Sequence, residues 1–259
     1  MTWGIKLTKT PWEAFWKERY ESLASIELPA WQKASWWYEY IVEKQKKFVE
    51  KNVGSAKTQK KIIAVDVGCG PGINLGHLIK MGFHPIGIDY SKRTICSLKA
   101  IIKSEEASLV VGDAYNIPLK SGTADVVLYF GVMQTTDEPR GHIFQLAETL
   151  KPGGILLMST LRRHTKWELP FWPIYLLSRQ DYLTENSNRN TEMIRLRDHL
   201  VPRPADDPHN LLKRYSQKEL RRWLADAGLV NISFQYDGLV NIFPHLSNSI
   251  MLYVRAVKR

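Results

Sequence analysis

The stretch Asp66-Val67-Gly68-Cys69-Gly70-Pro71-Gly72 decides the fold. It completes the apolar run of residues 62–67 (IIAVDV), which is typical of a buried parallel strand. Glycines directly after a strand allow a tight turn and the close approach of a ligand to backbone N–H groups. Asp89 ends the next apolar run, residues 85–89, and a carboxylate there can accept both hydroxyls of a ribose. Together these features predict a nucleotide-containing ligand at the ends of the first two strands.

Apolar strands alternate with helical segments along most of the remaining chain. Further strand-like runs cover residues 108–111, 124–130, 154–160, 229–235 and 250–257. Helical patterns cover a segment ending near Gly82 and residues 91–103, 142–150 and 216–227. Strands that alternate with helices predict βαβ units and a mainly parallel sheet.

The two ends of this alternating region define the expected domains. Residues 1–60 are expected to form an N-terminal helical cover, because aromatic side chains recur there at helical spacing. They are Trp12, Phe15, Trp16, Trp36, Trp37 and Tyr40. Residues 61–259 form the expected ligand-binding domain, in which the alternation stops after Thr160 and leaves an insert at residues 161–214.

Composition limits the class of protein. Hydrophobic residues make up 44% and charged residues 24% of the 259 residues, as in soluble globular proteins. Cys69 and Cys96 lack metal-ligand spacing and form no disulfide framework, which favours a reducing cytoplasm. No secretory signal is visible, and the longest apolar run, residues 169–177 (LPFWPIYLL), is shorter than the roughly 20 residues that span a bilayer. We expect a cytoplasmic protein without a transmembrane segment, and peripheral membrane contact through this run stays open.

Two kinds of nucleotide ligand compete for the glycine turn. The dinucleotide fingerprint needs a third glycine at the position that Ile73 occupies. The run is instead D-x-G-x-G-x-G, which resembles the first motif of class I S-adenosylmethionine (SAM)-dependent methyltransferases. The resemblance extends over residues 61–160. Gly87-Ile88-Asp89-Tyr90-Ser91 resembles the second motif, Gly112-Asp113-Ala114 the third, residues 125–134 (DVVLYFGVMQ) the fourth, and Leu150-Lys151-Pro152-Gly153-Gly154 the turn before the fifth strand.

This resemblance implies a fold, a cofactor and a set of binding residues. The fold would be a three-layer Rossmann-like α/β structure with a seven-stranded, mainly parallel sheet whose last strand is antiparallel. The cofactor would be SAM, with Asp89 on the ribose, Tyr90 against the adenine and Asp113 on the adenine amino group. The full expected cofactor set is Asp66, Gly68, Cys69, Gly70, Asp89, Tyr90, Asp113, Ala114, Phe130 and Gln134.

Within the family, the chain resembles the type-11 group, which includes ubiquinone/menaquinone C-methyltransferase-like enzymes and many natural-product and glycan methyltransferases. One departure is Thr149, where an arginine commonly precedes the LKPGG turn. We expect this change to affect packing rather than cofactor binding. Members differ widely in acceptor, so the resemblance does not name one.

Methyl transfer itself requires few catalytic groups. Alignment of the reacting atoms supplies much of the acceleration, and a base is needed only when the acceptor must lose a proton. His164 and His209 are the candidate bases, although a surface or packed role is more common for any one histidine. We expect no metal, because the acidic pair Asp206/Asp207 precedes Pro208 and has no further ligand at a suitable spacing.

Charge gives the only hint about the acceptor. The formal net charge is +10, yet residues 61–160 hold nine basic and nine acidic side chains, so the flanking segments carry the whole excess. Such an excess attracts an anionic partner. The candidate acceptor contacts are Trp36, Trp37, Tyr40, Arg162, Arg163 and Arg203. A solvated basic face explains the arginines equally well.

The leading interpretation is therefore methyl transfer to an O, N or C atom of a small, anionic molecule, with a lipid-linked or glycan acceptor as a variant. A nucleic-acid methyltransferase would also explain the charge. However, the fourth strand is not followed by an N/D-P-P-Y/F motif, and the basic residues are scattered rather than striped. A non-catalytic SAM-binding partner subunit would likewise keep the glycine turn. The sequence does not indicate an oligomeric state.

Overall fold

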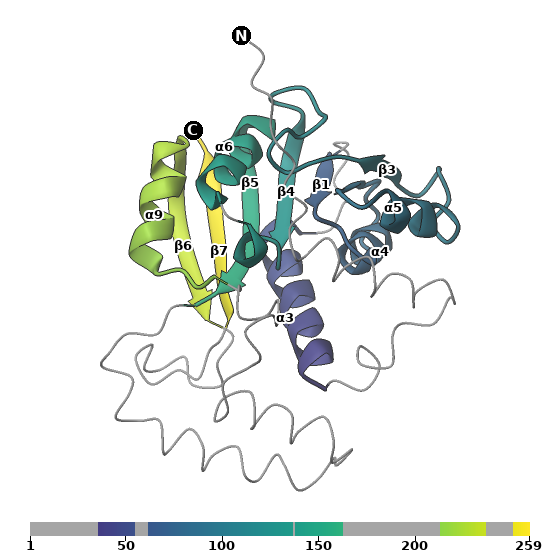
Figure 1. Ribbon diagram of the computed structural model, residues 1–259, viewed down its shortest axis with the longest axis horizontal. Coiled ribbons are helices and arrows are strands. Elements are labelled where there is room, and N and C mark those ends of the chain that lie inside the picture. Colours follow the sequence, from purple (N-terminus) through teal and green to yellow (C-terminus); the bar gives the residue numbers. More distant parts are fainter. Residues whose placement is uncertain (1–35, 55–61, 137, 163–212, 237–250) are drawn as a thin grey trace, which may run out of the picture. The chain divides into compact units, whose positions relative to one another are not determined.

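The computed structural model describes residues 36–54, 62–136, 138–162, 213–236 and 251–259. All of them belong to one compact unit of the chain. Its centre is a seven-stranded sheet with the strand order β3-β2-β1-β4-β5-β7-β6 (Figure 1). The first five strands are mutually parallel, and β7 is antiparallel to both β5 and β6. The expected sheet, with its antiparallel last strand, is confirmed.

The sheet consists of β1 (Ala64–Val67), β2 (Ile86–Asp89), β3 (Ser108–Val111), β4 (Ala124–Phe130), β5 (Leu150–Leu161), β6 (Leu229–Tyr236) and β7 (Met251–Lys258). The described helices are α3 (Trp36–Val53), α4 (Ile73–Lys80), α5 (Lys92–Lys99), α6 (Pro139–Thr149) and α9 (Gln217–Asp226). A short 3-10 turn, η2 (Met133–Thr135), follows β4.

Helices cover both faces of the sheet, because neighbouring strand residues point to opposite sides. In β4, Val126 and Leu128 pack with buried residues of α3 and α4, whereas Val127 and Tyr129 pack with those of α6 and α9. A third, smaller cluster joins α4 and α5. Both faces of the central strands are therefore apolar and buried, which explains their continuous hydrophobic runs.

Three element boundaries lie three or more residues from those expected. Helix α6 begins at Pro139 rather than His142, because proline fits the first helical turn, where its missing N–H is not needed. Helix α5 ends at Lys99 rather than residue 103, since the N–H groups of Ile101 and Ile102 both turn back to the Leu98 carbonyl.

The third difference is in β5, which begins at Leu150 rather than Gly154. Leu150 pairs with Ala124 and Ile155 with Val126, so the LKPGG segment is an irregularity within the strand. Thr149, just before it, is 3% exposed, and its hydroxyl donates to the Gln145 carbonyl at 2.8 Å. The Thr149 side chain is therefore packed at the end of α6.

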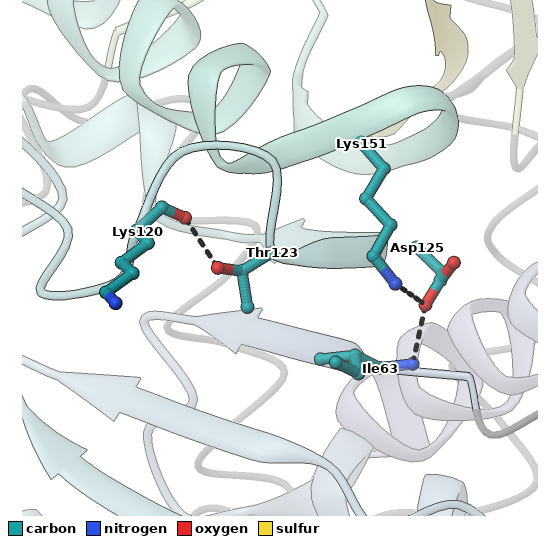
Figure 2. Close-up of polar contacts among 5 residues, drawn as sticks. All are labelled: Ile63, Lys120, Thr123, Asp125 and Lys151. Atoms are coloured by element: carbon teal, nitrogen blue, oxygen red, sulfur yellow. Dashed lines mark hydrogen bonds and ion pairs between the residues drawn. The ribbon is translucent and has the colours of Figure 1, made fainter.

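An ion pair fastens the amino-terminal ends of β1, β4 and β5. Asp125 Oδ2 accepts the Ile63 N–H at 2.9 Å and pairs with Lys151 Nζ at 2.7 Å (Figure 2). Nearby, the Thr123 hydroxyl closes the preceding turn by donating to the Lys120 carbonyl at 2.6 Å (Figure 2). This end of the sheet lies opposite the glycine turn, which leaves the carboxyl ends of the strands for a ligand.

Two expected segments lie largely outside the described residues. Of the predicted helical cover, α3 and residue 54 are described, and of the insert at residues 161–214, only Leu161, Arg162, Lys213 and Arg214 are. The domain division therefore stays a prediction. Among the described helices, none has the length and apolar character needed to cross a membrane.

Candidate functional site

The turn after β1 is built on glycines with left-handed backbone. Gly68 and Gly70 have φ angles of 74° and 48°. A Cβ on Gly68 would lie 2.3 Å from Val132 Cγ2, so both conformation and space require glycine there. The N–H groups of Gly68 and Cys69 both donate to the Ile88 carbonyl, at 2.7 and 3.0 Å. The turn is thereby fixed to the end of β2.

Asp89, the last residue of β2, joins this turn to helix α5. Its Oδ2 accepts the Gly70 N–H at 2.9 Å, and its Oδ1 accepts the Ser91 N–H at 2.8 Å. Burial raises the pKa of Asp89, and these two N–H groups oppose that rise. A carboxylate offers about four acceptor positions, so Asp89 keeps one on each oxygen for the hydroxyls of a ligand.

Asp66 stands two residues before Gly68 and is 1% exposed. Its Oδ2 has no hydrogen-bond partner within the described part of the chain. Burial, and then the charge of Asp89, raise the pKa of the Asp66 carboxyl from 3.8 to about 7. An ionised, unpartnered carboxylate in the interior is costly, and a ligand that brings a positive charge or a donor lowers that cost.

The neighbouring strand ends supply the second half of the site. Tyr90 is 50% exposed directly after β2. Val111 of β3 pairs with Asp89, so Asp113 follows at the same edge of the sheet. One carboxylate oxygen of Asp113 accepts the Tyr115 N–H at 2.9 Å, which leaves the other for a ligand. An exposed ring and a carboxylate at one edge can together hold a planar, hydrogen-bonding group.

Comparisons with known proteins identify the family. A family model described as a methyltransferase domain matches residues 38–233. The chain belongs to the class I SAM-dependent methyltransferases. This match is consistent with the type-11 resemblance, and membership in this family implies SAM as the cofactor.

Individual relatives of this methyltransferase are distant. The tRNA U34 carboxymethyltransferase of Klebsiella pneumoniae is 26% identical over 56% of the chain and 42% of its own length. The ubiquinone biosynthesis O-methyltransferase of Cereibacter sphaeroides is 32% identical over 39% of the chain and 42% of its own length. The chain thus spans less than half of the length of each of these two relatives.

A solved structure agrees in fold. The 1,6-didemethyltoxoflavin-N1-methyltransferase of Burkholderia thailandensis, with 1,6-didemethyltoxoflavin and S-adenosylhomocysteine bound, superposes with a TM-score of 0.58. It is 14% identical and covers 96% of this chain and 90% of its own. At this identity the likeness concerns the fold alone.

The polar atoms of the glycine turn fit SAM better than a dinucleotide. The N–H groups of Gly68, Cys69 and Gly70 are all used inside the protein, so they are not available to a pyrophosphate. The turn instead offers the unpartnered carboxylate oxygen of Asp66, a group that suits the cationic methionine end of SAM. The expectation that backbone N–H groups of this turn meet the ligand stays a prediction, since the N–H groups of these three residues have acceptors within the protein.

The other expected cofactor residues occupy different environments. Phe130 is 7% exposed, and its ring packs on Phe48 of α3 with centroids 6.4 Å apart. Cys69 is 5% exposed and packs in the cluster between α4 and α5. Ala114 packs against the core, while Gln134 has a buried Oε1 without a partner among the described residues. Only Gln134 of these four keeps a polar side-chain atom available to a ligand.

Several candidate residues lie outside the described residues or have undescribed side chains. His164, His209, Arg163 and Arg203 belong to the first group. Trp36, Trp37 and Tyr40 lie in the first turns of α3, and their side chains are not described. Arg162 is described: it directly follows β5 and is 6% exposed.

Sequence reasoning missed two residues that shape the turn. Val132 fills the space beside Gly68, and only the packing of the loop after β4 against that after β1 reveals it. The other is Ser91, which caps α5, since its Oγ accepts the Thr94 N–H at 3.2 Å. The Ser91 N–H also donates to Asp89 Oδ1 and thereby orients that carboxylate. Aspartate side chains commonly accept a hydrogen bond from the backbone N–H two residues later.

Proposed function

We propose that this chain transfers the methyl group of SAM to an O, N or C atom of a small, anionic acceptor. The observation that carries the proposal is the pair of carboxylates at the glycine turn. Asp89 is oriented by two backbone N–H groups, and Asp66 is buried with one oxygen unpartnered among the described residues. The chain's family membership adds the cofactor to this arrangement.

Each group has a distinct role in this proposal. SAM, when bound, supplies an electrophilic methyl group on a sulfonium. Asp89 accepts the ribose hydroxyls, Asp113 accepts the adenine amino group, and Tyr90 covers the ring. Asp66 balances positive charge at the methionine end. Alignment of the acceptor then supplies about 7–11 kcal/mol of the acceleration in well-ordered systems.

In this proposal, the acceptor is bound by residues of the helical cover and of the segment after β5. Both carry excess positive charge, whereas residues 61–160 are neutral. A relative named for ubiquinone biosynthesis supports a small molecule. We assign Trp36, Trp37, Tyr40, Arg162, Arg163 and Arg203 to acceptor binding, and His164 or His209 to proton removal where the acceptor needs it.

Calorimetric titration with SAM tests the cofactor site. Gly70→Arg should abolish binding, because a long side chain would fill the turn at a left-handed position. Asp89→Ala should weaken it by about 1.5–3 kcal/mol, the range for hydrogen bonds to a charged group. Glu105→Ala, at an exposed position after α5, is the control and should bind normally. Wild-type affinity in both site variants would remove the assignment.

An RNA acceptor is the second candidate, because one relative is named a tRNA U34 carboxymethyltransferase. Turnover with bulk tRNA, measured over a range of salt, distinguishes it from the small-molecule reaction. Phosphate contacts make the affinity fall steeply with salt, with a slope close to the number of contacts. Methylated tRNA together with such a slope would replace the small-molecule proposal.

A further inference from the structure

The segment that precedes α9 is hydrogen-bonded to the turn after β4. The Lys213 N–H donates to the Gln134 carbonyl at 2.9 Å, and the Tyr215 hydroxyl donates to the Met133 carbonyl at 3.2 Å. The Tyr215 N–H also donates to the Leu161 carbonyl at 3.0 Å, at the end of β5. Tyr215 is 4% exposed, so its main chain and its hydroxyl connect η2 to β5 from inside the protein.

The turn η2 lies where ligands bind in sheets of this kind. The strand order β3-β2-β1-β4-β5 changes direction between β1 and β4, and open α/β sheets bind ligands at the carboxyl ends of the strands at such a switch point. The loops after these two strands meet there, since a Cβ on Gly68 would lie 2.3 Å from Val132 Cγ2. Turn η2 directly follows Val132. A residue that holds η2 in place therefore acts beside the cofactor turn.

Gln134, in the middle of η2, carries an acceptor without a donor. Its Oε1 is buried and has no hydrogen-bond partner among the residues that the structure describes. Its Nε2 would lie 3.7 Å from a Cβ on Gly131, so the side chain folds back over the glycine that follows β4. A buried amide oxygen without a donor is unfavourable, and a donor on a bound ligand removes that cost. Gln134 is therefore suited to accept a hydrogen bond from the cofactor.

We propose that Tyr215 is a positioning residue for the cofactor. Through its hydrogen bond to Met133, it holds Gln134 where the amide oxygen accepts from the ammonium group at the methionine end of SAM. This inference rests on the proposed function, in which Asp113 binds the adenine and Asp89 the ribose. These two residues lie at the ends of β3 and β2, so the methionine end extends toward β1 and β4, beside η2. Tyr215 itself touches no ligand in this arrangement.

Two ligands that differ at the methionine end test this role in the full chain. S-adenosylhomocysteine carries the amino-acid group, and 5′-methylthioadenosine has the same adenosine and sulfur without it. Tyr215→Phe removes the hydroxyl and keeps the ring, which packs on Trp223 with centroids 5.7 Å apart. Calorimetric titration should give S-adenosylhomocysteine binding about threefold to tenfold weaker in this variant, the size of one neutral hydrogen bond. The affinity for 5′-methylthioadenosine should be unchanged, which also shows that the variant is folded.

A double variant shows whether Tyr215 acts through Gln134. Gln134→Ala should weaken S-adenosylhomocysteine binding at least about tenfold, because it removes the acceptor of a charged donor. Tyr215→Phe in that background should cause no further loss, since the group that it positions is absent. Losses that multiply in the double variant would mean that the two residues act independently, and they would overturn the inference.

Tyr236→Phe is the matched control. The hydroxyl of Tyr236, the last residue of β6, is hydrogen-bonded to the Gln217 side chain of α9 rather than to η2, so this variant should bind both ligands like the wild type. A wild-type chain that does not bind S-adenosylhomocysteine would contradict the proposed function and, with it, the role of Tyr215. If the wild type binds it, three results overturn the role of Tyr215 alone: unchanged affinity in Tyr215→Phe, equal losses for both ligands, or the same loss in Tyr236→Phe.

Discussion

The protonation state of Asp66 and the binding of a ligand depend on each other. Its carboxyl has a pKa raised from 3.8 to about 7, by burial first and by the charge of Asp89 second. In the folded chain without ligand it is therefore mostly protonated below pH 6 and mostly ionised above pH 8. A cationic ligand binds the ionised form, so binding must release a proton in the lower part of this range.

We therefore expect SAM to bind about tenfold more tightly at pH 8 than at pH 6, the effect of one proton released around pH 7. Calorimetry in buffers of different ionisation enthalpy should show the released proton. Asp66→Asn removes the titrating group, so its affinity should change much less over the same range. A proton release that persists in Asp66→Asn would assign the pH dependence to another group, such as the amino group of the ligand.

The same shift makes the folded state without ligand sensitive to pH. The raised pKa stabilises the fold fully below pH 4, and this contribution is lost as pH rises through about 7. Thermal unfolding without ligand should consequently give a lower Tm at pH 8 than at pH 5.5. Asp66→Asn should flatten that decline, and an equally steep decline in the variant would contradict the role of Asp66.

Site residues could be predicted from sequence where a motif dictates backbone geometry. Gly68, Gly70 and Asp89 lie together as expected, because a tight turn after a buried strand leaves few alternatives. The environments of Phe130 and Cys69 could not be predicted. Whether a side chain at a strand end faces a helix or a ligand depends on tertiary packing, here on Phe48 of α3 and on the cluster between α4 and α5.

At the scale of elements, α9 is a helix whose start is fixed by hydrogen bonds in its first turn. Ser216 Oγ accepts the Glu219 N–H, and the Glu219 side chain accepts the Ser216 N–H at 2.9 Å, which is a complete capping box. Leu220 and Leu224 then bury one side of the helix against the sheet. The helical pattern over residues 216–227 predicts this helix from sequence, and Gly228 directly follows it.

Ser216→Ala should destabilise the fold by about 1 kcal/mol, the usual contribution of a helix N-cap. The loss follows because the first-turn N–H groups of α9 would have no side-chain acceptor. Urea unfolding measures it as a lower midpoint with an unchanged slope. Ser104→Ala, at an exposed position, is the control and should have no effect. Equal stabilities of the two variants would contradict the role of the cap.

Strand positions could be predicted more closely than helix ends. The central strand β4 is buried and apolar on both faces, so its run stands out and has the expected bounds. The edge strand β3 is more exposed and also has the expected bounds. The end of α5 depends on where Ile101 and Ile102 turn back to Leu98, and no proline or glycine marks that place. The start of β5 depends on pairing between Leu150 and Ala124, which only the assembled sheet contains.

For the molecule as a whole, ligand-induced stability distinguishes the two nucleotide interpretations. S-adenosylhomocysteine at about a hundred times its Kd should add about 2.7 kcal/mol to the free energy of unfolding and raise the Tm by several degrees. NAD and NADP should leave the Tm unchanged, because the N–H groups of Gly68, Cys69 and Gly70 are already used. Gly70→Arg should abolish the shift. A shift with NAD alone would contradict membership in the SAM-binding class.

The position of β7 determines the order in which the sheet can be completed during synthesis. β7 lies between β5 and β6 and is hydrogen-bonded to both, yet it follows both in the chain. While the ribosome is still making residues 251–258, the facing edges of β5 and β6 have no partner. A nascent chain at that stage offers two open strand edges, the form most prone to association with other chains. Completing the sheet therefore requires the insertion of a strand between two strands made earlier, and chaperones that shield open strand edges would act on this chain until β7 has been made.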